Sequence, residues 1–408
     1  MRLFHISDLH IGKRPGRRDM TEELRHILMD IVLGEAYDAY RPDGLIIAGD
    51  IYDRSLPSSE SVALFDEFLI RAAELSLPLY IISGNHDSDR RISYGRDIFR
   101  RSGVHISRPF TGDGSLYIAQ AGGVDIVLMP YISLERLRSV YPDEDIPDMT
   151  AGMRLVFSRN GLPRRDRPCV IAAHQAVGRF GSEKATVCAC CQFGDSDSKT
   201  FSRNTNQNTA PVCARAAGTL ELIDPDVFEG FAYAALGHFH SPMSPAENVR
   251  YCGSPLCYSK SEAARQPHKS LDIIDIEEGS SAAVEHFPLT PLHETRIISD
   301  SLSAILSDKH PPSDDYLYIT ITANDTPDDL PCGKTNSELI GGKFPNYIGI
   351  AYEMRSTAQD SVGGAYSAPS FEELLGGFYR EMCGGEIDDE LLSLACDIFD
   401  KCDEDETE

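Results

Sequence analysis

Five short polar segments, each directly after an apolar run, most constrain how this chain can fold. The apolar runs have the length and residue types of buried β-strands: Leu3–Ser7, Leu45–Ala48, Leu79–Ile82, Val170–Ala173 and Tyr233–Leu236. The polar segments that follow them are Asp8–His10, Gly49–Asp53, Gly84–Asp87, His174 and Gly237–His240. Sheet-based folds collect their chemistry where strands end. We therefore expect side chains from five strands to converge on one place.

These segments contain a mixed set of oxygen and nitrogen ligands for metal. The candidate ligands are Asp8, His10, Asp50, Asn85, His174, His238 and His240. Burying so many carboxylates and imidazoles together without a cation costs free energy, whereas two divalent ions would use every group. Asp50 is expected to bridge the ions, because a carboxylate can bind one ion through each oxygen. The donor set favours manganese, iron or zinc over magnesium.

Two such ions, ~3.5–4 Å apart, are typical of enzymes that hydrolyse phosphoesters. His86 adjoins a candidate ligand but need not bind metal itself. We predict that His86 is catalytic, stabilising the transition state or protonating the leaving oxygen, and that Asp87 orients its ring. The alternative for His86 is a purely structural role. No Gly-rich phosphate loop of the ATPase type is present in the sequence, so ATP hydrolysis by this chain is not expected.

The motifs resemble, in order and spacing, those of the calcineurin-like metallophosphoesterases: D-x-H, G-D-x-x-D, G-N-H-D, a single His, and G-H-x-H. Within that superfamily the chain is similar to the SbcD-type exonuclease subunits of SbcCD double-strand-break repair complexes. The closer resemblance depends on Phe4–Lys13, Ser83–Ser88, Ala235–His240, Tyr251–Leu256 and Tyr258–Ser259. It covers most of residues 1–290 and, more weakly, the rest of the chain. Asp53-Arg54-Ser55 and Asp87 depart from the pattern of the phosphoprotein phosphatases, which argues against that activity.

The resemblance implies a role for each candidate residue. One ion would be held by Asp8, His10, Asp50 and His240, and the other by Asp50, Asn85, His174 and His238. His86 matches the catalytic histidine of the family, and Asp53 is expected beside the ligands or facing substrate. The resemblance also implies manganese as the metal, with exonuclease activity and structure-specific endonuclease activity, including on hairpin ends.

The net charge of −26 is unusual for a protein expected to act on DNA. Residues 370–408 carry 14 acidic and 2 basic side chains, so this tail contributes −12 and the rest of the chain −14. Basic residues near the motifs are candidates to hold DNA phosphates, namely Lys13, Arg17, Arg18 and Arg90. Each could equally be an ordinary solvated charge. We expect a partner to supply most of the electropositive surface.

The sequence predicts an α/β fold organised in several parts. Residues 1–287 are expected to form a two-sheet sandwich flanked by helices, with helices near 21–40 and 58–75. In the second helix we expect Val62, Phe65, Leu69 and Ala73 to face the core. After Pro288, residues 288–355 are predicted to form a small α/β cap domain, followed by a linker at 356–369, a helical segment at 370–402 and an acidic tail at 403–408.

Apolar helices that follow a flexible linker are typical of partner docking. The resemblance implies that the helical segment binds an SbcC-type coiled-coil ATPase, and that the chain forms a homodimer within a heterotetramer. The alternative is that these helices fold back onto the catalytic domain. No apolar run approaches the ~20 residues that cross a bilayer. Because the chain opens directly into the strand before Asp8, we expect a cytoplasmic protein.

Eleven cysteines in a cytosolic chain are expected to be reduced. Cys188, Cys190, Cys191 and Cys213 lie in a polar insertion at 182–217, and their spacing is not typical of a zinc site.

Three functions remain open on the sequence: a DNA nuclease subunit, a small-molecule phosphodiesterase of the same superfamily, and a non-catalytic repair scaffold.

Overall fold

The computed structural model describes residues 1–179, 222–265, 268–277, 282–323 and 335–353, together with Leu375, Asp388 and Leu392. Residues 1–353 form one compact unit. Several predictions lie outside the described residues: the cysteines Cys188, Cys190, Cys191 and Cys213, the linker at 356–369, nearly all of the helical segment at 370–402, and the acidic tail at 403–408. They stay predictions, as do the domain boundaries.

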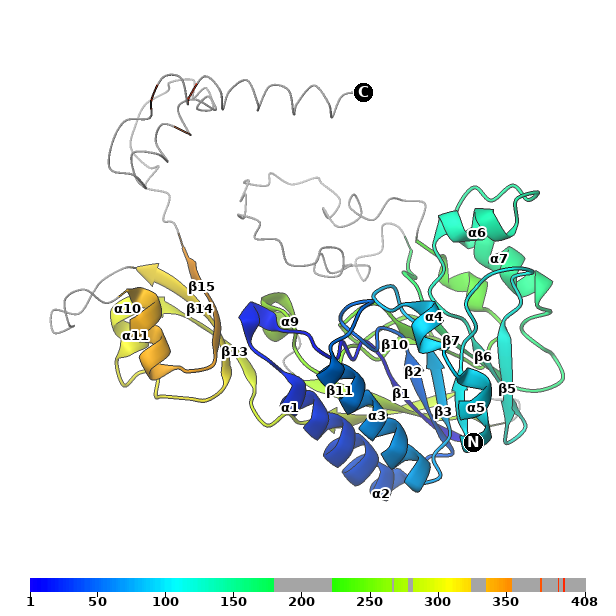
Figure 1. The fold of residues 1–408 in the computed structure, drawn as a ribbon, viewed down its shortest axis with the longest axis horizontal. Helices are drawn as coiled ribbons and strands as arrows, with labels where there is room; N and C mark the ends of the chain where they lie inside the picture. Colours follow the sequence, from blue (N-terminus) through cyan, green and yellow to red (C-terminus); the bar gives the residue numbers. More distant parts are fainter. Residues whose placement is uncertain are drawn as a thin grey trace. The chain divides into compact units, whose positions relative to one another are not determined.

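Two six-stranded sheets form most of this unit (Figure 1). The first sheet has the order β12 (Ala283–Leu289), β11 (Lys269–Asp275), β1 (Arg2–Ile6), β2 (Gly44–Ala48), β3 (Leu79–Ile82), β4 (Val104–Ile106). The second has the order β5 (Tyr117–Ala121), β6 (Val124–Leu128), β7 (Cys169–His174), β8 (Tyr233–Gly237), β10 (Val249–Tyr251), β9 (Met243–Ala246). The strands before the candidate ligands are parallel to one another within each sheet. Both faces of these strands are covered, which explains their unbroken apolar sequences.

Three apolar layers hold the sandwich together. The layer between the sheets contains side chains from both, among them Ile46, Tyr80 and Val170. Helices cover the outer face of the first sheet (Figure 1): α1 (Thr21–His26), a π-helical continuation at Ile27–Ala36, α2 (Tyr37–Tyr40) and α3 (Ser59–Glu74). The outer face of the second sheet packs against α6 (Leu134–Val140) and α7 (Met149–Arg159). The short helices α4 (Asp89–Ile92) and α5 (Arg96–Phe99) connect β3 to β4.

The helix predicted at 58–75 is present, but the predicted buried face is wrong in part. Ser61, Leu64, Phe65, Phe68 and Ala72 are buried. Val62 is 47 % exposed, and Ala73 is also exposed. Two sets of apolar residues in this segment share helical spacing, and the set with the two phenylalanines buries more apolar area. Ser61 is tolerated because it lies in the first turn, where Ser58 caps the helix by accepting from the Ser61 N–H.

A smaller unit follows at residues 295–352, which we call the cap unit. It has a parallel three-stranded sheet of β13 (Thr295–Ser301), β14 (Tyr316–Ala323) and β15 (Tyr347–Tyr352), with α10 (Leu302–Leu306) and α11 (Asn336–Lys343). Its core is aliphatic and aromatic, with Leu302, Ile305, Leu317 and Phe344 fully buried or nearly so. The predicted α/β class, with a two-sheet sandwich flanked by helices, is confirmed. No described helix is long and apolar enough to cross a membrane.

Candidate metal centre

The candidate ligands come together at the carboxyl ends of β1, β2, β3, β7 and β8. Backbone hydrogen bonds join the loops that follow β1 and β2: the Asp8 N–H donates to Gly49 O at 3.0 Å, and the His10 N–H donates to Asp50 O at 2.9 Å. Because parallel strands end at one edge of a sheet, and the two sheets face each other, five loops meet there. The convergence expected from the sequence is therefore present.

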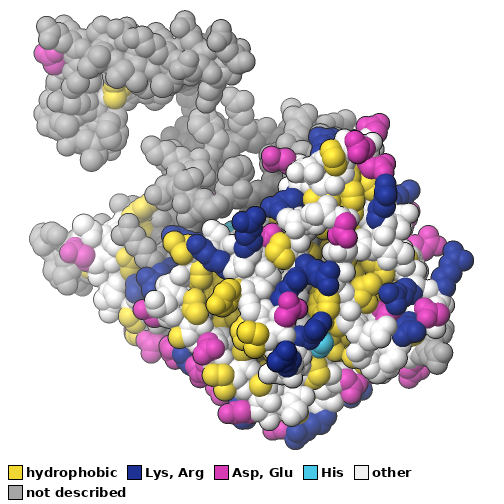
Figure 2. Space-filling view, turned by 45° about the vertical axis from the view of Figure 1, so that its right-hand side comes forward, with side chains coloured by type: hydrophobic (Ala, Val, Ile, Leu, Met, Phe, Trp, Pro, Cys, Tyr) yellow, Lys and Arg dark blue, Asp and Glu magenta, His cyan; other side chains and the backbone are white. Residues whose placement is uncertain are grey.

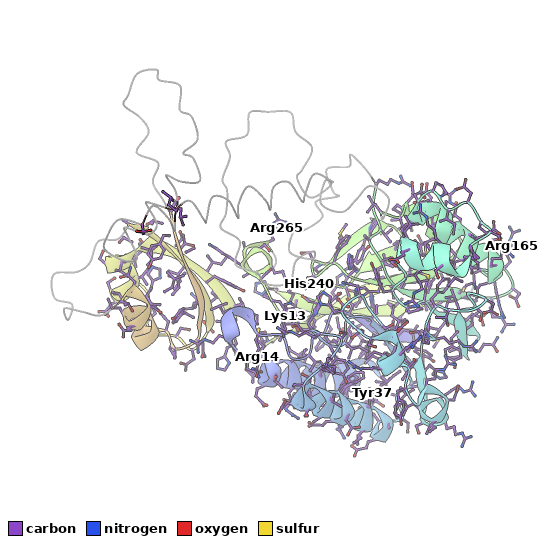
Figure 3. The ribbon with its side chains drawn as sticks, turned by 45° about the horizontal axis from the view of Figure 1, so that its top comes forward. Lys13, Arg14, Tyr37, Arg165, His240 and Arg265 are labelled. Carbon is purple, nitrogen blue, oxygen red and sulfur yellow. The ribbon has the colours of Figure 1, made fainter. Side chains whose placement is uncertain are left out.

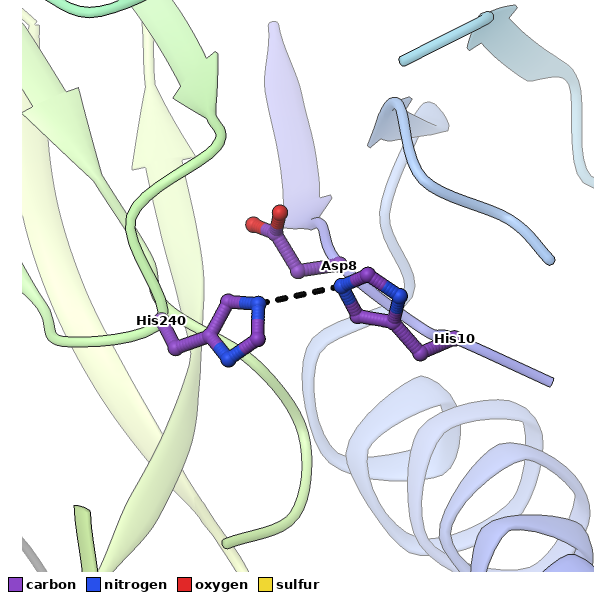
Figure 4. Close-up of side chains that lie close together, drawn as sticks. All are labelled: Asp8, His10 and His240. Carbon is purple, nitrogen blue, oxygen red and sulfur yellow. Dashed lines mark hydrogen bonds between the residues drawn. The ribbon is translucent and has the colours of Figure 1, made fainter. Parts of the chain in front are cut away.

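One group at this edge consists of Asp8, His10 and His240, whose ligand atoms lie within 4.8 Å of one another. Figure 4 shows the two imidazoles facing each other, with Nε2 atoms 3.0 Å apart. The Nδ1–H of His240 donates to Glu262 Oε1 at 3.0 Å. In the neutral tautomer, Nε2 of His240 therefore presents a lone pair toward His10.

The second group is built around Asp50 and Asn85. Asp50 Oδ2 lies 3.4 Å from His174 Nε2 and 3.6 Å from His10 Nε2, so this carboxylate lies between the two groups. Asn85 Oδ1 lies 3.0 Å from His174 Nε2 and 3.1 Å from His238 Nδ1. The structure thus brings all seven predicted ligands together at the edge, and their roles as ligands stay predictions.

The orientation of His174 is what a metal ligand requires. Its Nδ1–H donates to Ala48 O at 2.8 Å, which fixes the ring and leaves Nε2 as the lone-pair nitrogen of the neutral imidazole. In that tautomer the lone pair faces two oxygen acceptors, Asp50 Oδ2 and Asn85 Oδ1, so the position between them calls for a proton or a metal ion. In addition, the buried Nδ1 of His10 has no hydrogen-bond partner among the described residues. Lone pairs that face one another in a buried site fit a bound cation.

Backbone strain is concentrated at the same residues. Six described residues other than glycine have a positive φ, and four of these are the candidate ligands Asp8 (53°), His10 (45°), Asp50 (49°) and His238 (107°). Such conformations cost ~1–3 kcal/mol each and persist where the surrounding structure fixes them, most often at functional sites. The strain is evidence for function that does not depend on residue type.

Two glycines allow the loops to approach this closely. A Cβ on Gly84 would lie 2.1 Å from Asp50 Oδ1, and a Cβ on Gly237 would lie 2.0 Å from Ala48 O. Any side chain at either position would push a candidate ligand or its support out of place. The glycines in G-N-H-D and G-H-x-H are therefore explained by close packing.

Charge and burial shift the pKa values of the candidate ligands in opposite directions. Burial raises the pKa of Asp8. Burial also acts against ionisation of Asp50, but the neighbouring His174 outweighs it and holds the pKa of Asp50 well below its usual range. For His174, burial opposes the charge, yet Asp50 raises its pKa to about 9. A metal ion would replace the proton of His174, so metal binding and proton release are coupled here.

The prediction that Asp87 orients the ring of His86 is wrong. The carboxylate of Asp87 accepts three backbone N–H groups, from Gly84 at 2.9 Å, Tyr52 at 3.0 Å and Ile51 at 3.1 Å. The ring of His86 donates through Nδ1–H to the backbone oxygen of Asp53 at 3.0 Å instead. Asp87 thus holds together the loops that follow β2 and β3. Its carboxylate can only accept hydrogen bonds, and three backbone N–H groups use that capacity.

Asp53 lies beside the ligands, where the sequence placed it. Its Oδ1 is 3.7 Å from His10 Nδ1 and 3.0 Å from Lys13 Nζ. The other predicted DNA contacts differ in environment. Arg18 Nε donates to Tyr347 O of the cap unit at 3.1 Å, Arg90 is exposed, and the side chain of Arg17 lies outside the described residues. Figure 3 shows Lys13 in the same region as His240. Their roles in DNA binding stay predictions.

The sequence analysis missed a buried network that supports His240. Glu262, at 1 % exposure in the helix α9 (Lys260–Arg265), accepts from His240 Nδ1–H, from Lys269 Nζ at 2.8 Å and from Ser254 Oγ at 3.0 Å. Burial opposes ionisation of Glu262, but Lys269 and His240 outweigh it and hold its pKa far below the usual value. Nothing in the sequence marks either residue, because both lie in the polar stretch Ser259–Ser270.

The chain was compared with protein families and with solved structures. The family model of the calcineurin-like phosphoesterases matches residues 1–212, which is more than half of the 408 residues. Among solved structures, the chain is similar to the calcineurin-like phosphoesterase YfkN from Bacillus subtilis. That match has 11 % sequence identity and a TM-score of 0.33, and it covers 70 % of this chain and 90 % of that chain. The family match, on residues that include most of the candidate ligands, shows that the chain belongs to the calcineurin-like phosphoesterases.

Proposed function

We propose that the chain is a metal-dependent DNA nuclease, an SbcD-type subunit that works in the cytosol with an SbcC-type coiled-coil ATPase in DNA break repair and recombination. The observation that carries the proposal is the pair of ligand groups joined by Asp50, in a chain whose motifs extend beyond the superfamily pattern. The extended motifs at Tyr251–Leu256 and Tyr258–Ser259 surround the candidate ligand His240. Ser254 N–H donates to His240 O at 3.1 Å, and Tyr258 OH donates to Leu9 O.

Two divalent ions, proposed to be Mn²⁺, would supply the positive charge that polarises a phosphoryl oxygen and makes water nucleophilic near neutral pH. Asp8, His10 and His240 would hold one ion, Asn85, His174 and His238 the other, and Asp50 both. The protein's own part is to hold these side chains in place before substrate arrives, which Ala48 O and Glu262 do for two of the imidazoles.

His86 is proposed to exchange a proton with the substrate through Nε2. Its Nδ1–H is held by Asp53 O, and its backbone N–H donates to Asp50 Oδ1 at 2.9 Å, so the position of the ring is tied to the bridging carboxylate. Nε2 lies 4.0 Å from Asp50 Oδ2 and the side chain is partly exposed. It is therefore the ring nitrogen that a leaving oxygen can reach.

The remaining partners follow from the same proposal. The helical segment at 370–402 would bind the ATPase, and the chain would form a homodimer within a heterotetramer. Exposed apolar side chains on and near α3, α4 and α5 support a dimer surface; they are Leu56, Val62, Ile70, Tyr94, Ile98 and Phe99.

The decisive experiment is cleavage of a labelled hairpin-ended DNA duplex by the full chain with Mn²⁺, alone and with the coiled-coil ATPase and ATP. His86→Gln should retain metal and lose cleavage. The matched control His26→Gln removes an imidazole of α1 that contacts Asp30, and it should cleave normally. Full cleavage by His86→Gln would contradict the role of His86.

The same assay separates the alternatives. Turnover of a chromogenic phosphodiester without any cleavage of DNA, with the ATPase present, would favour a small-molecule phosphodiesterase. Retained repair function in an Asp50→Ala, His86→Ala double variant would favour a non-catalytic scaffold.

A further inference from the structure

A second concentration of charge lies on the connection from β3 to β4 and just beyond it. Residues 88–108 carry six arginines and two aspartates, a net charge of +4 in a chain whose net charge is −26. Figure 2 shows Lys and Arg side chains at several places on one face of the molecule, with Asp and Glu side chains among them. A local positive excess in an acidic protein marks a place where an anion is favoured.

Part of this segment lines a hollow, which we call the arginine hollow. It lies between α5, β4 and β5 and is lined by Arg96, Asp97, Arg100, Ile106, Arg108 and Tyr117. Three guanidinium groups therefore share one small space with one carboxylate. Within the described part of the chain, the only ion pair of these arginines is a 3.9 Å contact between Arg96 Nε and Asp97 Oδ2. Guanidinium groups are the donors that bind phosphate best.

Tyr117, which lines the arginine hollow, belongs to a group of stacked rings. The rings of Tyr80, His105 and Tyr117 stack in a row, with interplanar angles of 11° and 22°, and His105 Nδ1 lies 2.8 Å from Tyr117 Oη. The guanidinium of Arg108 lies 6.0 Å from the centroid of the Tyr117 ring. An arginine held against an aromatic face loses little freedom when it binds an anion.

The charge of the arginine hollow comes from arginine alone. Burial, and then the charge of Arg100, lower the pKa of His105, so this imidazole stays neutral near pH 7. Arg96 and Arg100 are four residues apart and lie on one side of the helical turn, whereas Ile98 lies on the opposite side. Ile98, the most exposed apolar residue of α5, therefore points away from these two arginines.

We propose that the arginine hollow binds a backbone phosphate of a nucleic-acid strand. Arg100 and Arg108 are exposed, so the hollow opens to solvent and can take one phosphate of a strand that continues beyond it. The exposed Arg90, Arg91 and Arg101 on the same connection extend the positive surface along such a strand. This inference rests on the proposed nuclease function, because it takes nucleic acid as the ligand.

The test is binding of fluorescently labelled DNA to the full chain, followed by anisotropy over a range of salt concentrations. The triple variant Arg96→Gln, Arg100→Gln, Arg108→Gln is compared with Arg71→Gln, Arg154→Gln, Arg165→Gln, which removes the same charge from exposed arginines elsewhere. Figure 3 shows Arg165 far from His240 in that view. We expect the first variant to bind about tenfold more weakly, with a salt slope smaller by ~1, and the control to bind nearly as the parent chain.

Equal binding by the two triple variants would overturn the proposal. Turnover of a small chromogenic phosphodiester should be the same in both, since neither alters the metal centre, and a loss only in the first variant would also count against a separate site. Because the readout is binding, the two proposals can fail independently. DNA that is bound through the hollow but never cleaved would contradict the nuclease and keep the site. A parent chain that binds no DNA by itself would overturn the site, whereas the nuclease would still be judged by cleavage with the ATPase present.

Discussion

Two regions of the molecule, the edge of the sandwich that carries the candidate ligands and the cap unit, are both built from parallel strands and helices. They bury different kinds of side chain. The edge buries Asp8 and His174 completely and holds four candidate ligands at positive φ. The cap unit buries side chains such as Leu317 and Phe344, and none of its described residues has a positive φ. The edge gives up local stability for the placement of polar groups, whereas the cap unit is an ordinary apolar core.

The largest expected effect tests the edge as a place of chemistry. Asp50→Asn keeps the shape of the side chain but removes the charge that lies between the two ligand groups. We expect hydrolysis of a chromogenic phosphodiester to fall at least ~10³-fold, because the charge stabilisation lost is worth several kcal/mol. Steady-state kinetics would measure the loss of activity, and urea unfolding would measure any change in the free energy of unfolding. A variant with activity within tenfold of the parent would remove Asp50 from the mechanism.

The next effect tests the cap unit as a plain core. Leu317→Ala should lower the free energy of unfolding by ~3 kcal/mol, because Leu317 is 1 % exposed and its removal leaves a cavity. The affinity for Mn²⁺, measured by calorimetry at 25 °C, should not change. Leu292→Ala, at a residue that is 54 % exposed, is the matched control and should cost little. A large loss of metal affinity in Leu317→Ala would show that the two regions are not independent.

A smaller effect concerns the support of one candidate ligand. Glu262→Gln should weaken Mn²⁺ binding ~10–100-fold, because the amide orients His240 less well than a carboxylate does. Glu135→Gln, exposed on α6, is the control. Adding Lys269→Met removes the buried cation that Glu262→Gln leaves unpaired. If that double variant folds and binds metal like the parent chain, Glu262 does not position His240.

The smallest expected effect is a pH dependence of stability that comes from the sandwich and not from the cap unit. Burial lowers the pKa of His5, in β1, to about 4 from an ordinary value near 6.5. Between pH 6.5 and pH 4, His5 is protonated in the unfolded chain but not in the folded chain. The free energy of unfolding therefore falls as the pH falls from 6.5 toward 4. Between pH 7 and pH 5 this should cost about 2 kcal/mol. His5→Gln should reduce the pH dependence of urea unfolding by that amount, and an unchanged dependence would assign the loss to other groups.

Much of the sandwich was predictable because its signals are local. Runs such as Leu45–Ala48 and Leu79–Ile82 are too short and apolar for anything but buried strands, and each ends at a candidate ligand. The face of α3 was not predictable from spacing alone, since the set with Val62 and Ala73 and the set with Leu64 and Phe68 both have helical period. The helix α11 was missed because it carries two glycines and buries only Ile340.

At the candidate site, residue types were predictable but their supports were not. The seven candidate ligands follow from strand ends, and the structure brings them together. The groups that orient His174 and His86 are backbone oxygens, of Ala48 and Asp53, which every residue has and no motif can mark. Glu262 and Lys269 are seven residues apart on different elements, so only the fold reveals that they neutralise each other.

The positive φ angles of Asp8, His10, Asp50 and His238 have a consequence for protein engineering. Glycine adopts this conformation without steric cost, so Gly substitutions that relax the backbone at these positions stand to recover stability in the metal-free chain. Any library selected only for heat resistance would drift toward glycine there and lose the candidate ligands one side chain at a time. Selection for a thermostable variant of this chain must therefore screen for metal binding in every round.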